Sequence, residues 1–170
     1  MMAAAVLWGL TVAARPGDVG PSSPTAPIVE ERLEAVRKAP TDSRARLELG
    51  VAYAQAEEYD LAMAELVEAI KLNPDNRDNL SARANYHLGL VLLAIDRAGL
   101  AVNAFREALR LAPSAIEAHA GLGLALEGSG RVDEAIAQYE LYLQSASGAD
   151  QHSAEAIAQR LAKLKERRKM

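Results

Sequence analysis

Apolar and polar residues follow a helical period along most of the chain. In the stretch 47–76, apolar residues return every three or four positions, which places them on one face of an α-helix. The pattern breaks near Glu57 and stops before Pro74, because the residue preceding a proline disfavours helical backbone angles. It predicts two antiparallel helices, with Asp60 as the N-cap of the second. From Ile28 onward, helices follow one another.

The helix pair recurs along the chain. Gly50, Gly89 and Gly123 each follow a leucine, and an alanine stands twelve residues after each glycine. A bulky apolar residue lies four positions further on, and a proline closes the first two units. The glycine and alanine positions allow two helices to approach closely, and the bulky residue fills the gap beside them. The repeated positions are Gly50, Tyr53, Ala62, Ala69 and Pro74, then Gly89, Ala101, Phe105, Ala108 and Pro113, then Gly123, Ala135 and Tyr139.

The units are not evenly spaced. The glycines lie 39 and then 34 residues apart, so five extra residues, around Asn76 to Leu80, separate the first two units. We expect these residues to form a longer loop or an earlier helix start, and a partner-contacting loop is the alternative. The third unit also departs from the pattern, since Tyr142 replaces a small residue and no proline closes it.

These positions resemble the tetratricopeptide repeat, in which Leu-Gly, Tyr, Ala, an aromatic residue, Ala and Pro recur within about 34 residues. The resemblance implies an all-α, right-handed α-solenoid of helix-turn-helix repeats. A helix pair cannot bury its apolar face alone, whereas stacked neighbours can. We expect a half repeat at 28–42, repeats at 43–76, 82–115 and 116–148, and a C-terminal capping helix with a basic, solvated tail at 150–170, capped by Ser153.

The N-terminal segment differs in composition. Residues 1–14, MMAAAVLWGLTVAA, carry no charged side chain. As a helix they would span about 21 Å, short of the hydrocarbon core of about 30 Å, so they suit a secretory signal or a short membrane anchor. No basic residues precede them, and a leader without such a role is the alternative. Residues 15–27 hold four of the seven prolines and are expected to form a flexible linker. An exported or membrane-anchored location is favoured, with a cytoplasmic one as the alternative.

The composition of the chain excludes several classes of binding site and reaction. The net charge of −4 gives no general attraction to nucleic acid. The absence of cysteine excludes disulfides, thiolate metal sites and thiol catalysis. The three histidines lack the spacing of a metal site, and no serine-nucleophile or phosphate-binding motif is present. We therefore expect no cofactor, no metal and no enzymatic activity.

The resemblance also indicates where a partner would bind. In this family the first helix of each repeat lines a concave surface, and its second, fifth, ninth and twelfth positions commonly face a ligand. The residues that clamp a partner's C-terminal carboxylate in some relatives are replaced here. Some of the matching positions, such as Leu47, could instead pack between repeats. The groove candidates are Arg44, Leu47, Val51, Arg83, Tyr86, Leu90, Leu93 and Leu124.

We therefore expect a non-catalytic scaffold or adaptor that binds a peptide or helix of a protein partner in an apolar groove. The alternatives are an accessory subunit of an enzyme or membrane-associated complex, and a self-assembling repeat protein. Association with a membrane would occur through the N-terminus.

Overall fold

The computed structural model describes residues 25–145 and 151–168, and within them the chain is helical and has no β-strand. Eight α-helices and one short 3₁₀ helix follow one another along the described residues. They are α1 (Ala26–Lys38), α2 (Ser43–Gln55), α3 (Tyr59–Leu72), η1 (Arg77–Asn79), α4 (Leu80–Ala94), α5 (Ala98–Leu111), α6 (Ile116–Gly128), α7 (Val132–Ser145) and α8 (Gln151–Arg167).

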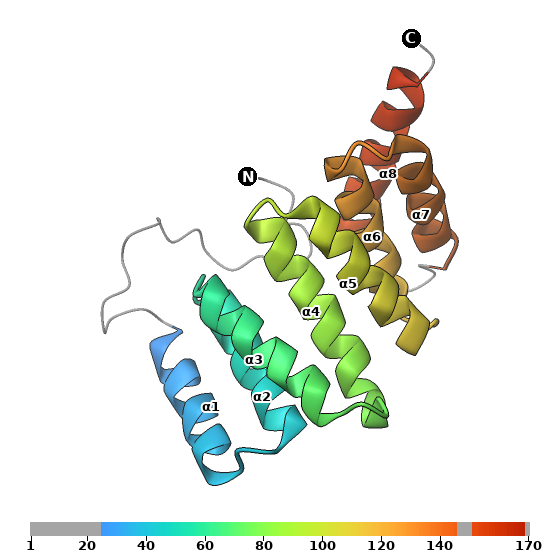
Figure 1. Cartoon of the computed structure of the whole chain (residues 1–170). Coiled ribbons are helices and arrows are strands. Elements are labelled where there is room, and N and C mark those ends of the chain that lie inside the picture. Colours follow the sequence, from blue (N-terminus) through green and yellow to red (C-terminus); the bar gives the residue numbers. More distant parts are fainter. Residues whose placement is uncertain (1–24, 146–150, 169–170) are drawn as a thin grey trace.

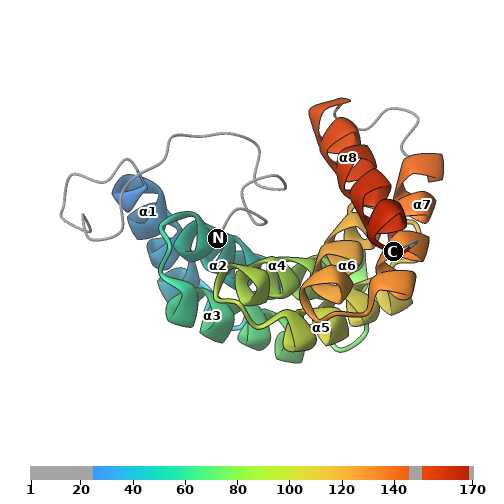
Figure 2. The same ribbon diagram turned by 90° about the horizontal axis from the view of Figure 1, so that it is seen from above.

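The helices pair and stack into an arc (Figures 1 and 2). Within each repeat, the first helix packs on the second: α2 on α3, α4 on α5 and α6 on α7. Seen from above, α2, α4 and α6 form the inner side of the arc and α3, α5 and α7 the outer side, with α1 and α8 at the two ends (Figure 2). The predicted all-α solenoid with a C-terminal capping helix is therefore confirmed.

Glycine allows the paired helices to approach closely. A Cβ added to Gly50 would lie 2.8 Å from Leu66 Cγ, and one added to Gly89 would lie 2.7 Å from Phe105 Cζ. The third repeat has the same contact between Gly123 and the ring of Tyr139. Any larger residue at these positions would have to displace the facing side chain or push the two helices apart, which explains the recurrence of glycine.

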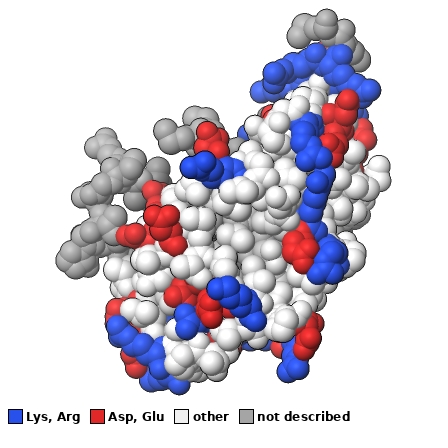
Figure 3. All heavy atoms as spheres, in the orientation of Figure 1, with Lys and Arg blue, Asp and Glu red and all other residues white. Residues whose placement is uncertain are grey.

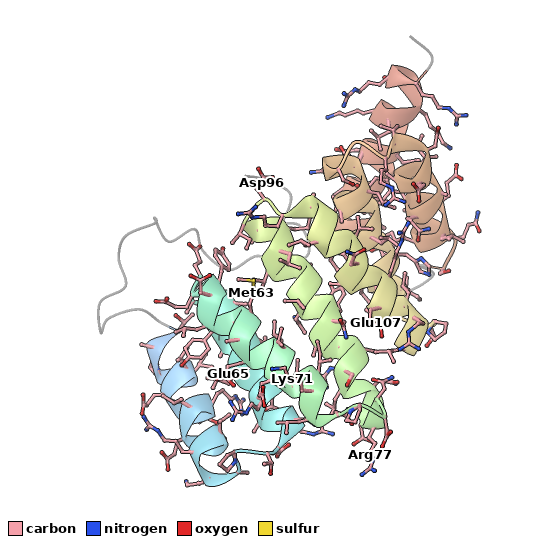
Figure 4. All side chains as sticks on the ribbon, viewed as in Figure 1. Met63, Glu65, Lys71, Arg77, Asp96 and Glu107 are labelled. Atoms are coloured by element: carbon pink, nitrogen blue, oxygen red, sulfur yellow. The ribbon has the colours of Figure 1, made fainter. Side chains whose placement is uncertain are left out.

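The turns between paired helices share one backbone conformation. In each turn, one residue has a positive φ, and the amide of the next residue donates to the carbonyl five positions earlier. This is the Schellman arrangement that ends a helix. Figure 4 shows Asp96 in the α4–α5 turn, at the end of α4 opposite to Arg77. The positive-φ residues are Glu57 (61°), Asp96 (61°) and Gly130 (77°).

The five-residue insertion forms an ordered connection between α3 and α4. Asn73 Nδ2 donates to the carbonyl of Arg77 at 3.0 Å, and Asn73 Oδ1 accepts from the Arg77 amide at 3.1 Å. Asn76 Nδ2 donates to the carbonyl of Leu111 at 3.0 Å, which ties the connection to the end of α5. The insertion thus forms η1 and also starts α4 at Leu80, two residues before the expected position 82.

Three local expectations need correction. Helix α3 begins at Tyr59, so Asp60 lies in its first turn rather than at its N-cap. Helix α8 begins at Gln151, so Ser153 is already helical. Helix α1 begins at Ala26, inside the expected linker, because Pro27 is compatible with a first helical turn.

The apolar segment 1–14 and the rest of the linker, up to residue 24, lie outside the described residues. None of the helices that the structure describes combines the length and apolar character needed to cross a bilayer.

Candidate protein-binding groove

The inner side of the arc buries three of the eight groove candidates. Leu47 is fully buried, and Leu90 and Leu124 are 2% and 4% exposed. Leu47 packs in the core cluster that joins α2, α3 and α4, while the other two pack in the core cluster around Phe105. The prediction that these three leucines face a partner is therefore corrected: the close approach of neighbouring helices covers them, and they support the surface from beneath.

The other five candidates keep part of their surface. Val51, Tyr86 and Leu93 are half-buried, and Arg44 and Arg83 are exposed. They belong to α2 and α4, the first two helices of the inner side. The term "inner groove" is used below for the surface formed by these five residues. It combines apolar side chains with two arginines.

Aromatic contacts fix the middle of the inner groove. The Tyr86 ring meets Phe105 edge to face, with ring centroids 5.9 Å apart, and meets His87 in the same way at 5.3 Å. Burial and the nearby Glu117 carboxylate raise the pKa of Tyr86 to about 12. Burial and the charge of Arg83 lower the pKa of His87 to about 4. Both rings are therefore neutral at physiological pH, and this part of the groove can take an apolar partner side chain.

The two arginines differ in their surroundings. Arg44 lies 3.3 Å from the Asp78 carboxylate in an exposed ion pair. Arg83 forms no ion pair with any residue that the structure describes. Because exposed pairs contribute little, both guanidinium groups can bind a carboxylate of a partner.

The last repeat and the capping helix are joined by a polar cluster. The Tyr139 hydroxyl donates to Glu127 Oε2 at 2.7 Å, and Arg160 of α8 donates to the same oxygen at 3.2 Å. Burial and the Glu127 carboxylate raise the pKa of Tyr139, so its hydroxyl remains a donor. Beside this cluster, α6 and α8 border a cleft of about 350 Å³ that the sequence analysis did not identify. Its lining includes Glu127, Gln159, Arg160, Lys163 and Arg167.

The repeat-signature residues occupy structural rather than functional positions. Ten of them are buried between the helices, Tyr53 is half-buried, and Pro74 and Pro113 lie exposed after the helix ends. The buried ones are Gly50, Ala62, Ala69, Gly89, Ala101, Phe105, Ala108, Gly123, Ala135 and Tyr139. Within 25–145 and 151–168, no three His, Asp or Glu side chains gather in a group that could hold a metal ion.

The comparisons agree with this arrangement. The Tetratricopeptide repeat family model matches residues 30–77, 68–116 and 86–150, so the chain belongs to the tetratricopeptide repeat family. Proteins with this fold generally serve as scaffolds for interactions between proteins, with extended concave binding surfaces. No curated protein matches the chain.

Solved structures with the same architecture include a crystal structure of MamA. It is 30% identical, has a TM-score of 0.63, and the match covers 71% of this chain and 68% of that one. MamA 41-end from Desulfovibrio magneticus RS-1 is 21% identical with a TM-score of 0.65, and 84% of both chains is covered. The Arabidopsis OM64 TPR domain is 24% identical with a TM-score of 0.63, covering 72% of this chain and 95% of that one. The last two likenesses concern the fold alone.

Proposed function

We propose that this protein is a non-catalytic adaptor that binds a segment of a partner protein in its inner groove. The observation that carries the proposal is the row of half-buried apolar side chains, Val51, Tyr86 and Leu93, contributed by two successive repeats. Isolated apolar side chains on a surface are ordinary, whereas several of them on successive helices that line a concave face suit a partner's anchors.

The chemistry of the groove defines the kind of segment. Its apolar residues suit a helix with one apolar face or an extended segment with alternating apolar anchors. Arg44 and Arg83, at the second position of α2 and the fourth of α4, favour a carboxylate near one edge of that segment. The Tyr86 ring and the His87 ring packed against it are neutral, so they carry no charge that would oppose apolar contact.

A selection experiment tests the proposal. A random peptide library displayed on phage is selected against the full chain, and fluorescence anisotropy measures the affinity of the enriched peptides for wild type and variants. We expect Leu93→Glu to weaken binding by about tenfold or more, since an apolar anchor would then meet a charge.

Leu100→Glu is the matched control. Leu100 is 57% exposed on α5, on the outer side of the arc, and receives the same change of charge. Binding to this variant is expected to stay at the wild-type level. If no peptide is enriched, or if both variants weaken binding equally, the groove is not the binding surface.

Self-assembly is the second candidate, because Ile28 of α1 and Leu141 of α7 are 44% and 42% exposed in the first and last parts of the solenoid. Light scattering of the full chain over a range of concentrations separates the two functions. A molar mass that rises with concentration would favour self-assembly, and a constant mass would favour the adaptor.

A further inference from the structure

Some of the positive charges of helix α8 take no part in the ion pairs that connect it to the rest of the solenoid. Its apolar side inserts Ile157 and Leu164 into the core, where they are fully and almost fully buried. Helix α8 and the residue after it, Arg168, hold five described Lys and Arg side chains, of which three are paired: Arg160 with Glu127 at 3.2 Å, Lys165 with Glu140 at 2.7 Å and Arg168 with Asp133 at 3.1 Å. The other two, Lys163 and Arg167, form no ion pair with a described residue.

The two unpaired cations line the same cleft. Lys163 and Arg167 stand one helical turn apart on α8 and border the cleft of about 350 Å³ between α8 and the end of α6. Glu127 is the acidic residue of this lining, and its carboxylate already accepts from Tyr139 and Arg160. The cleft therefore has an excess of positive charge, while Ala156 and Leu164 give it an apolar wall.

The cleft continues the inner side of the arc. Glu127 stands at the twelfth position of α6, which corresponds to the twelfth residue from Ala82 in the preceding repeat, namely Leu93. Helix α8 follows α6 at the end of the arc (Figure 2). A segment that crosses the inner side from Val51 past Leu93 would next meet Glu127 and then the cations of α8.

From this arrangement we infer that the partner segment carries two carboxylates at one end of its apolar anchors, and that Lys163 and Arg167 bind them. The inference rests on the proposed function and specifies its ligand. Neighbouring side chains on a helix lie about 5–6 Å apart at their Cβ atoms. Alternate residues of an extended chain are about 6–7 Å apart, so two acidic residues separated by one other residue match the spacing of the cations.

A protein ligand explains the charge better than a polyanion does. Affinity for nucleic acid grows with the number of phosphates neutralised, and the two cations of the cleft, on a chain of net charge −4, supply little of it. Figure 3 shows cations gathered over the projecting end of α8, while the outer face over α4 and α5 is mostly uncharged.

The library selection described above also tests this inference. We expect the enriched peptides to contain two acidic residues at one end of an apolar stretch, and Lys163→Gln combined with Arg167→Gln to weaken their binding about tenfold. Lys165→Gln combined with Arg168→Gln removes the same charge from α8 but outside the cleft lining, so it is expected to leave binding within about twofold of wild type.

A second measurement leaves the protein unchanged. Replacing the two peptide carboxylates by amides is expected to weaken binding to wild type about tenfold, and added salt is expected to weaken only the acidic peptide. Peptides that depend on Leu93 but lack the acidic pair would overturn this inference alone. Failure to enrich any peptide would overturn the proposed function together with it.

Other anions are separate outcomes of the test. Vesicles of phosphatidylserine and phosphatidylcholine, and a duplex DNA oligonucleotide, are titrated with wild type and the cleft double variant. Binding that requires Lys163 and Arg167 here, with no acidic pair in the selected peptides, would assign the cleft to those anions and overturn the inference.

Discussion

The middle repeat and its two neighbours fill the same position between their paired helices in different ways. The first repeat places Arg46 opposite Glu65, with Nη1 and Oε2 2.8 Å apart. The third places His119 opposite Gln138, also at 2.8 Å. At the matching positions of the middle repeat stand Asn85 and Ala104, and the Asn85 amide donates instead to the carbonyl of Ser81 in its own helix.

The middle repeat is held by close packing instead. Asn85 and Ala104 do not form a polar pair with each other. They border a hollow of about 370 Å³. The Phe105 ring, however, lies between two glycines, Gly89 of its own repeat and Gly121 of the next. The comparison teaches that the repeat geometry does not require a polar pair at this position, since a ring packed against glycine occurs with the pair in the third repeat and without it in the middle one. The first and third repeats should therefore be sensitive to the loss of their polar partners, whereas the Phe105 ring, which packs on two glycines, should make the middle repeat sensitive to added volume.

The largest expected effect on stability comes from added volume beside the Phe105 ring. A Cβ added at Gly121 would lie 2.4 Å from Phe105 Cε1. Gly121→Ala is expected to lower the free energy of unfolding by about 2–3 kcal/mol. Gly50→Ala meets the flexible Leu66 side chain at 2.8 Å and should lower it by about 1 kcal/mol or less. Urea denaturation followed by circular dichroism measures both.

Two controls separate crowding from helix propensity. Gly99→Ala has no neighbouring atom within 4 Å of the added Cβ, so it should be neutral or stabilising by up to about 1 kcal/mol. Phe105→Leu in the Gly121→Ala background should recover part of the loss. If Gly50→Ala and Gly121→Ala cost the same, the enclosed ring is not the special feature of the middle repeat.

The second largest expected effect on stability is a dependence on pH that arises from His87. The folded-state pKa of His87 is about 4, below the ordinary 6.5, so the unfolded chain takes up the proton more readily. The contribution of the neutral His87 ring to the free energy of unfolding is therefore fully present above about pH 6.5, and it is lost as the pH falls toward 4. We expect a loss of about 2 kcal/mol between pH 7 and pH 5, measured by urea denaturation at each pH.

The His87→Leu variant isolates this effect from the other two histidines. It should have a much flatter pH dependence over the same interval, whatever its stability at pH 7. A wild-type curve that is already flat between pH 7 and pH 5 would show that the burial of His87 does not control its protonation.

The smallest effect concerns the polar pair of the first repeat. The Arg46 and Glu65 side chains are only 22% and 20% exposed, so losing one partner leaves a charge poorly solvated. Glu65→Gln is expected to lower the free energy of unfolding by about 1–2 kcal/mol. Ala104→Gln introduces the residue that the third repeat has at this position, Gln138. Because the new side chain would extend into the hollow, the free energy of unfolding should change by less than about 1 kcal/mol. Equal losses in thermal denaturation would remove the distinction between the repeats.

Much of the architecture follows from local sequence. Gly89 and Phe105 recur in phase with Gly50 and Leu66, and this phase fixes which helices pair and how closely. Asn73-Pro74 ends α3 through the backbone restrictions of proline. These features depend on steric rules within one helix pair, so the sequence alone was sufficient to predict the repeats and the capping helix.

The groove and the cleft depend on neighbouring repeats. Helical periodicity assigns Leu90 and Leu93 to a common face, but only the packing of neighbouring helices decides that Leu90 is buried and Leu93 is half-buried. Likewise, the sequence shows that the end of α8 is basic. It does not show which of these cations form ion pairs within the described residues. Lys163 differs from Lys165 because Glu140 of α7 lies within reach of Lys165 alone. The sequence by itself therefore determined the repeating helical scaffold, and the tertiary structure decided which side chains remain available to a partner, since burial and ion pairing join residues distant along the chain.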